Sequence, residues 1–332
     1  MLRYVGIRLL QIIPLLAAIS VLVFIIIQLP PGDFLTSYVE QLKLSGNDVD
    51  ESKILNLTAQ YGLDKPLYMQ YFIWIKNIVL HADFGTSFQY DMPVSVIIGE
   101  RLLLTMTISL LSLIIIWAIA IPVGVYSATH QYSPLDYVFS FLGFVGMAVP
   151  GFLIALILIY VVYAQTGVAI TGLFSPEFAD APWSWAKVRD MLPRMIVPVV
   201  IVALSGTAGL VRVTRGMMLD ELSKPYVLTA RAKGLSETKL LWKYPVRTAI
   251  NPLVSTVGWT FPALLSGEAI VSIVLNLPTT GPILLNALMV QDMYLAGSFI
   301  LMLSVMTVLG TLFSDILLAL LDPRIRYGEM RA

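Results

Sequence analysis

The amino-acid sequence predicts an all-α membrane protein with six membrane-spanning helices. Of its 332 residues, 58% are hydrophobic and only 13% are charged, and the mean hydropathy is +0.83. A soluble domain carries about 25% charged residues, so most of this chain has too little polar surface to face water. Two further observations support the prediction: a series of long uncharged runs, and a basic stretch that interrupts them.

Six runs in the sequence approach the length of about 20 apolar residues that a membrane-spanning helix needs. They lie within 9–29, 102–128, 137–164, 195–211, 251–273 and 298–321. The first run is longer than the apolar core of a signal peptide and lacks a clear cleavage site, so we interpret it as an uncleaved span. The fourth run is short, the fifth contains Glu268, and the sixth contains Asp315 near one end.

Positive charges near the spans predict the orientation of the chain, because cytoplasmic loops are rich in Lys and Arg. Arg3 and Arg8 precede the first span, and Lys and Arg outnumber Asp and Glu by eight to three in the loop 212–250. With six spans, the N-terminus, this loop and the C-terminus fall on one side, which we expect to be the cytoplasm. The segment 30–100 then lies outside, and we interpret the acidic patch at 47–52 as a solvated loop.

Two external regions are expected to lie at the membrane surface. In the segment 30–100, apolar residues at helical spacing predict an amphipathic helix that lies on the outer face or caps the pore. These residues are Tyr68, Tyr71, Phe72, Trp74, Ile75 and Ile78. The loop 165–194 contains Trp183 and Trp185, and tryptophans beside spans usually anchor at the level of the lipid headgroups.

The sequence offers little for catalysis. The chain has no cysteine, which excludes disulfides, thiolate metal sites and cysteine nucleophiles. It also lacks a phosphate-binding loop, a His-Glu-x-x-His metal helix and a Gly-x-Ser-x-Gly elbow. We therefore expect no enzymatic activity, no catalytic residue, no metal and no cofactor, and the zero net charge does not favour nucleic acid. Energy for active transport would have to come from a partner.

Glu268 is the one ionisable residue expected well inside a span. A charge that faces lipid costs several kcal/mol, so protein or water must screen this carboxyl group. It could face a wet cavity or bond to a neighbouring helix, and the sequence does not decide between these alternatives. It is the candidate for an intramembrane polar site.

The basic stretch from Ser223 to Pro252 predicts two short helices joined by a tight turn. Pro225 suits the first turn of a helix, Gly234 supplies a left-handed stop, and Ser236 can cap the next helix. Small residues there would let another surface approach closely, namely Ala230, Ala232 and Gly234. The stretch is either a docking element or a helix at the lipid interface with snorkelling Lys and Arg.

This stretch resembles the so-called EAA loop of ABC import permeases. Leu228-Thr229-Ala230 stands in place of the acidic-Ala-Ala triplet, and Gly234 stands as the family glycine. Further motifs in family order are similar to one branch, the dipeptide, oligopeptide and nickel permeases, in the form of their first membrane subunit. They are Pro31-Gly32-Asp33, Tyr61-Gly-Leu-Asp-Lys-Pro-Leu-Tyr-Met-Gln-Tyr71, Asp83-Phe-Gly-Thr-Ser-Phe88, Pro93-Val94 with Glu100-Arg101 and Thr105, and Leu321-Asp-Pro-Arg-Ile-Arg-Tyr327.

The resemblance implies the type I ABC importer permease fold in a single permease domain, 1–332, with an external segment at 30–100 and a cytoplasmic coupling loop at 212–250. It implies three kinds of partner besides the lipid bilayer: a second homologous permease subunit, two ABC ATPase subunits and an external solute-binding protein. It also implies a bacterial or archaeal cytoplasmic (inner) membrane, with both termini cytoplasmic. The residues expected to couple the pore to an ATPase are Tyr226, Thr229, Ala230, Arg231, Ala232, Lys233, Gly234 and Leu235.

The sequence departs from the family pattern at two places, and the second of them, on the expected outer side, leaves the substrate open. Thr248 stands where the family usually has Asn, and Leu277-Pro-Thr-Thr-Gly-Pro282 replaces a Pro-Gly-Leu-Gly turn. The resemblance implies oligopeptides or dipeptides, with an oligosaccharide or a nickel complex as alternatives. A secondary transporter that works alone, or a passive channel, would fit the composition but would not explain the basic stretch.

Overall fold

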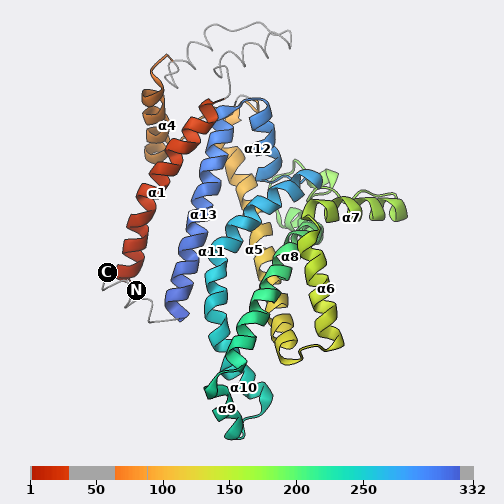
Figure 1. The fold of residues 1–332 in the computed structure, drawn as a ribbon. Helices are drawn as coiled ribbons and strands as arrows, with labels where there is room; N and C mark the ends of the chain where they lie inside the picture. The colour runs from red at the N-terminus through yellow and green to blue at the C-terminus, as the bar shows by residue number, and fades with distance from the viewer. Residues whose placement is uncertain (1, 30–63, 88, 322–332) are drawn as a thin grey trace. The chain divides into compact units, whose positions relative to one another are not determined.

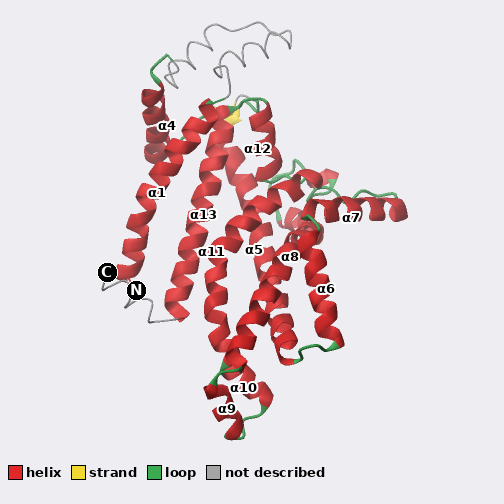
Figure 2. Ribbon diagram, in the orientation of Figure 1, coloured by secondary structure: helices red, strands yellow, loops and turns green. Residues whose placement is uncertain are grey.

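A computed structural model describes residues 2–29, 64–87 and 89–321. Helices make up most of these residues (Figure 2). The chain divides into two compact units, the first formed by Met1–Val5, Thr105–Pro278 and Leu309–Ala332, and the second by Gly6–Leu104 and Thr279–Val308. The acidic patch at 47–52, the motif at 31–33 and the C-terminal tail lie outside the described residues.

The second unit contains the predicted amphipathic helix, which is α4, Leu67–His81. It packs on α1, Leu2–Gln28, through a buried cluster that includes Phe24, Ile27 and Trp74. The Tyr71 hydroxyl shares a 2.9 Å hydrogen bond with Ser20 Oγ of α1. Part of α4 stays uncovered, since Tyr68 and Phe72 are exposed.

A short hairpin and an extra helix in this unit were not predicted. β1, Thr86–Ser87, pairs with β2, Met92–Pro93, and α12 spans Thr280–Met289 before α13, Met293–Leu321. Asp292 connects these elements, because Ser87 Oγ donates to its Oδ2 at 2.6 Å and Leu295 N donates to its Oδ1 at 3.2 Å. The carboxylate thus caps α13 and holds the hairpin. Its negative charge at the start of α13 is favourable for the helix macrodipole.

The first unit is built around α8, Trp185–Leu222. It contains α5, Val94–Thr129, from Thr105 onward, together with α6, Pro134–Ala148, α7, Gly151–Thr166, a 3₁₀ turn at Pro176–Phe178, and α11, Pro245–Val274. α8 packs against α6, α7 and α11. α5 approaches α8 so closely that a Cβ on Gly124 would lie 2.5 Å from Thr214 Cβ, which is the close helix contact that small residues permit in membranes.

α8 is much longer than the fourth span predicted at 195–211. Its 38 residues extend about 57 Å at 1.5 Å per residue, whereas the hydrocarbon core of a bilayer is about 30 Å thick. The apolar run ends where charged residues begin, but Lys, Arg and Glu are good helix formers, so the helix continues through them. Pro193 and Pro198 lie inside α8 without ending it.

The third predicted span, within 137–164, is broken. α6 and α7 meet at an angle of 98°, and α7 points away from the line of α6 (Figure 1). Val149, just before Pro150, is extended with ψ of 118°, the conformation that a following proline favours. A second bend, of 49°, separates Glu237–Gly258 from Thr260–Val274.

The number of spans depends on how these bent pairs are counted. Among the described residues, four helices are long and apolar enough to cross a membrane alone, and the total reaches six if each bent pair is one span. The all-α membrane fold is therefore confirmed, and the six-span prediction agrees with the structure when each bent pair is counted as one span.

Candidate functional site

The basic stretch folds as predicted into two short helices at the end of α8 (Figure 1). We call residues 223–244 the paired-helix segment. α9, Pro225–Ala232, begins with Pro225 at its first turn, and α10, Glu237–Lys243, follows the turn at Gly234. Gly234 has φ of +78°, a conformation that glycine adopts at little cost. Ser236 precedes α10 as expected, but its side chain makes no capping hydrogen bond.

The paired-helix segment has a small apolar core of its own. Val227, Ala230 and Leu240 are buried, and Leu235 and Tyr244 pack against them. Ala230 therefore points into the segment and not toward a partner, because it lies three residues after Val227 and shares its helix face. Ala232 and Gly234 remain exposed, as expected of residues that let another surface approach.

Of the other predicted coupling residues, Leu235 is half-buried, and the following are exposed: Tyr226, Thr229, Arg231 and Lys233. Leu228 and Trp242 are also exposed, at 59% and 53%. The segment thus presents a mixed surface of apolar, small and basic side chains over a packed interior.

Two polar contacts fix the shape of the segment. Arg231 bridges the turn to Glu237 with Nε–Oε1 at 2.5 Å and Nη2–Oε2 at 3.0 Å, and this carboxylate raises the pKa of the guanidinium further. The Tyr226 hydroxyl donates to Glu221, near the end of α8. Partial burial and the Glu221 carboxylate raise the pKa of Tyr226, so the phenol stays a donor at neutral pH.

The paired-helix segment is rooted in the core of the first unit. Met218 of α8 is fully buried with Val125 and Ala128 of α5 and with Val246 and Ala249 at the start of α11. Both helices that enter and leave the segment are therefore packed side by side where it begins. A displacement of the segment would act directly on α8 and α11.

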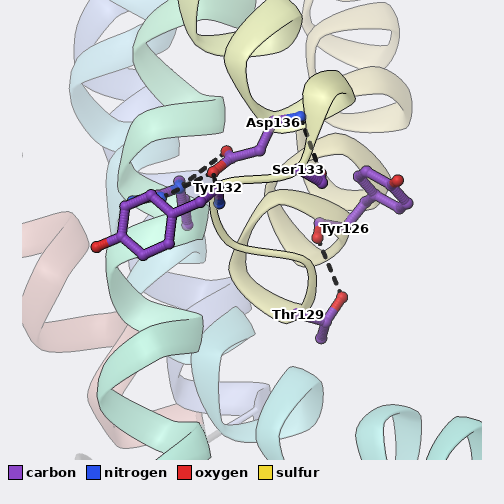
Figure 3. A network of polar contacts seen from close by, with 6 residues as sticks. Tyr126, Thr129, Tyr132, Ser133 and Asp136 are labelled. Carbon is purple, nitrogen blue, oxygen red and sulfur yellow. Dashed lines mark hydrogen bonds and ion pairs between the residues drawn. The ribbon is translucent and has the colours of Figure 1, made fainter.

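An ion pair between a buried carboxylate and a half-buried guanidinium joins α6 to α8 about two turns before α8 ends. Asp136, in the first turn of α6, is 4% exposed and accepts from Arg215 Nη2 at 3.1 Å and Nε at 3.3 Å. Tyr132 N donates to Asp136 Oδ2 at 3.0 Å, and Ser133 Oγ accepts from Asp136 N at 3.2 Å (Figure 3). The pair joins the α5–α6 turn to α8 through a two-pronged contact of the kind Arg forms with carboxylates.

Sequence reasoning counted Arg215 only as a positive charge of the cytoplasmic loop and did not single out Asp136. A local signal for Asp136 existed, since Ser133-Pro134 followed by Asp136 is typical of a helix start. Its partner could not be foreseen, because 79 residues separate the two.

A cavity of about 430 Å³ lies at the break between α6 and α7. α8 and α11 form the rest of its wall, and among the described residues that line it none is charged. Pro150, Ser205, Gly206, Thr260 and Gly267 give it small or hydroxyl-bearing surfaces. We call it the central cavity; its size is within the range of small-molecule sites.

Glu268 lies next to the central cavity in sequence but does not line it. Its side chain is fully buried, and Ser272 Oγ, one turn later on α11, donates to its Oε1. The carboxyl group is thus covered by protein, as a polar group inside the membrane must be. Within the described residues no cluster of three or more His, Asp or Glu could hold a metal ion.

Comparisons with known proteins match nearly the whole chain. Residues 120–327 match the family described as binding-protein-dependent transport system inner membrane component, and residues 1–110 match the N-terminal region of such membrane components. The chain is 35% identical to the oligopeptide transport system permease protein AppB of Bacillus subtilis strain 168 over 331 residues, covering 98% of this chain and 100% of that protein.

A protein of Sinorhizobium fredii named as a probable peptide ABC transporter permease is 29% identical over 325 residues, covering 98% of this chain and 99% of that protein. Among solved structures, the inward-facing MetNI methionine ABC transporter contains a chain with a TM-score of 0.53 at 14% identity. The match covers 68% of this chain and 96% of that chain, and it shows the fold.

We expect Asp136 and Arg215 to be energetically coupled. In a double-mutant cycle with Asp136→Asn and Arg215→Gln, thermal unfolding in detergent should give a coupling energy of about 1–3 kcal/mol, because loss of the Arg215 guanidinium leaves the buried carboxylate of Asp136 without its charged partner. The exposed pair Arg231–Glu237 is the matched control and should couple less, because water screens it. Equal coupling in the two pairs would contradict the structural role of the buried pair.

Proposed function

We propose that this chain, which belongs to the family of binding-protein-dependent transport system inner membrane components, imports oligopeptides and is driven by ATPase subunits that dock on the paired-helix segment. Family membership makes it a permease subunit of an importer and a multi-pass inner membrane protein. We propose that it has no catalytic role of its own. Full-length similarity to permeases named for peptide transport is the observation that carries the substrate assignment.

The proposed assembly contains a second, homologous permease subunit, two ABC ATPase subunits and an external solute-binding protein. The two permease subunits would enclose the translocation pathway, and the central cavity would be this chain's contribution to it. An uncharged wall with small side chains suits a ligand that must pass through and leave. Residues 1–332 would act as one permease domain, because α5 and α13 each contribute residues to both compact units.

The coupling role of the paired-helix segment is supported by its construction. Its internal core keeps the two helices together while Tyr226, Leu228, Ala232 and Gly234 stay exposed. Its packed connections to α8 and α11 would transmit a movement of the ATPases to two walls of the central cavity. ATP-driven closure would then switch the pathway between inward-open and outward-open states.

The proposed orientation places the loop 212–250 and both termini in the cytoplasm, and the segment 30–100 and the loop 165–194 outside. The distribution of Lys and Arg supports this orientation. The length of α8 is consistent with it, because a helix longer than the membrane leaves turns free to carry a cytoplasmic segment.

The substrate class can be tested on the whole importer, purified from a co-expressed operon and reconstituted in vesicles. We expect ATP hydrolysis to rise when the binding protein is loaded with an oligopeptide and to stay near its basal rate when it is loaded with an oligosaccharide or a nickel complex. Stimulation by one of these other ligands instead would identify that ligand, and not an oligopeptide, as the substrate. Transport by the purified chain alone, down an ion gradient, would refute the importer.

A charge at Gly234 should uncouple the pore from the ATPases. Gly234→Asp should leave membrane insertion intact but reduce peptide-stimulated ATP hydrolysis to near the basal rate, because a larger charged side chain blocks close docking. Gly167→Asp is the matched control, since Gly167 also has positive φ and open space around it, so backbone strain is similar in both variants. If Gly234→Asp retained full stimulation, the segment would be a lipid-interface element.

Because the chain contains no cysteine, single cysteines can report its orientation. Val168→Cys and Ala232→Cys place thiols at exposed positions on either side of the proposed membrane. In right-side-out vesicles, a membrane-impermeant maleimide should label Val168→Cys directly and Ala232→Cys only after the vesicles are opened. The reverse pattern would invert the topology.

A further inference from the structure

A second cavity, of about 340 Å³, lies at the other end of α8 from the paired-helix segment. Its walls are the loop that follows α7, the early turns of α8 and the segment that follows α11. Two charged residues line it, Asp190 and Arg194, and the rest of the wall is mainly apolar. In the proposed orientation this cavity opens on the outside, so we call it the outer cavity.

The hydrogen bonds around this charged pair are unequal. Both carboxylate oxygens of Asp190 are occupied, because Ser175 N donates to Oδ2 and Ser175 Oγ donates to Oδ1, each at 2.6 Å. Arg194 uses Nη2 to donate to Ser175 Oγ at 2.9 Å, and its Nε lies 3.6 Å from Asp190 Oδ1.

A guanidinium has five N–H donors, so most of the donors of Arg194 have no acceptor within the described part of the chain. The outer cavity can therefore still donate hydrogen bonds from a positively charged group, the guanidinium of Arg194.

The loop that carries Ser175 is held firmly. Lys187 is only 6% exposed, and its Nζ donates to Ala181 O at 2.6 Å and to Ala179 O at 3.3 Å. The same ammonium lies 4.7 Å from the centre of the Phe174 ring and 5.3 Å from that of Trp183. These cation–π contacts and hydrogen bonds fix the loop, and through Ser175 they orient the guanidinium before any ligand arrives.

We propose that the outer cavity receives the C-terminal carboxylate of the transported peptide and that Arg194 recognises it. Arg binds a carboxylate through two parallel N–H donors, and Asp190 keeps the guanidinium in place without consuming them. The apolar wall, with Val197 and Leu275, suits the last side chain of a peptide better than a bare inorganic anion. This proposal rests on the proposed function, since it presumes a peptide substrate delivered from outside.

The test compares two forms of one short peptide, with a free C-terminus and with a C-terminal amide. Initial uptake is measured in vesicles that contain the complete importer, at concentrations that saturate the binding protein. The wild-type importer should prefer the free acid, and Arg194→Gln should reduce this preference about tenfold, the effect of losing a charge-assisted hydrogen bond. Any preference of the binding protein itself cancels, because it is the same in both importers.

Arg189→Gln is the matched control, because Arg189 lies on the same helix, is exposed and does not line the outer cavity. It should leave the preference unchanged. Arg194→Lys, which keeps the cation but loses the paired donors, should give an intermediate preference and provides a second test if Arg194→Gln does not assemble.

Three outcomes would overturn the inference. An unchanged preference in Arg194→Gln would remove Arg194 from recognition. An equal loss of uptake for both peptide forms would assign Arg194 to docking of the binding protein or to the fold of the loop. A wild-type importer that takes up neither peptide form would refute the peptide function itself, and this inference with it.

Discussion

Backbone hydrogen bonding in lipid is the constraint on which the rest of this structure depends. No water is present in the hydrocarbon to bond a free N–H or C=O, so the chain must cross as helices. α8 extends this solution to 38 residues, and its surplus turns emerge on both sides of an apolar middle. Asp190 and Arg194 lie in the turns at one end, and Arg215 lies near the other. One helix thereby connects the outer cavity, the central cavity and the paired-helix segment.

The same constraint limits where a helix can break, and it therefore applies to the break at Pro150. Non-helical backbone at membrane depth is tolerated only where protein covers it or where it lines a wet cavity. Pro193 and Pro198 are accommodated inside α8, whereas Val149 becomes extended before Pro150 and the chain turns by 98°. The central cavity lies at this break, with Pro150 and Gly151 in its wall. A wet cavity there would account for both the broken helix and the small hydroxyl-bearing lining.

Local rules predicted well what local residues decide. Five of the uncharged runs correspond to single helices and the third is divided between α6 and α7. Pro225 and Gly234 placed the start and the turn of the paired-helix segment correctly. The inward position of Ala230 was missed, because it depends on Leu240 packing across the turn. Asp136 with Arg215, and Ser175 with Asp190 and Arg194, were missed for a related reason: burial and partnership arise from helix packing and loop closure, which periodicity does not encode. The length of α8 was underestimated because charge ends an apolar run without ending a helix.

The distribution of charge along the first unit also bears on selectivity. A peptide carries charged termini, and moving a bare charge into a low-dielectric cavity is costly. The uncharged central cavity offers no counter-charge, so the termini would have to cross it in a hydrated state, and it would distinguish peptides by size. A site that recognises a charged terminus is more effective at the entrance of the pathway, where water remains near the charge and the free energy lost on desolvation is smaller. In the proposed orientation, Arg194, 39% exposed and oriented by Ser175, would lie in such a place. Recognition of the C-terminal carboxylate in the outer cavity, together with an uncharged central cavity, would let one importer accept peptides with many different side chains.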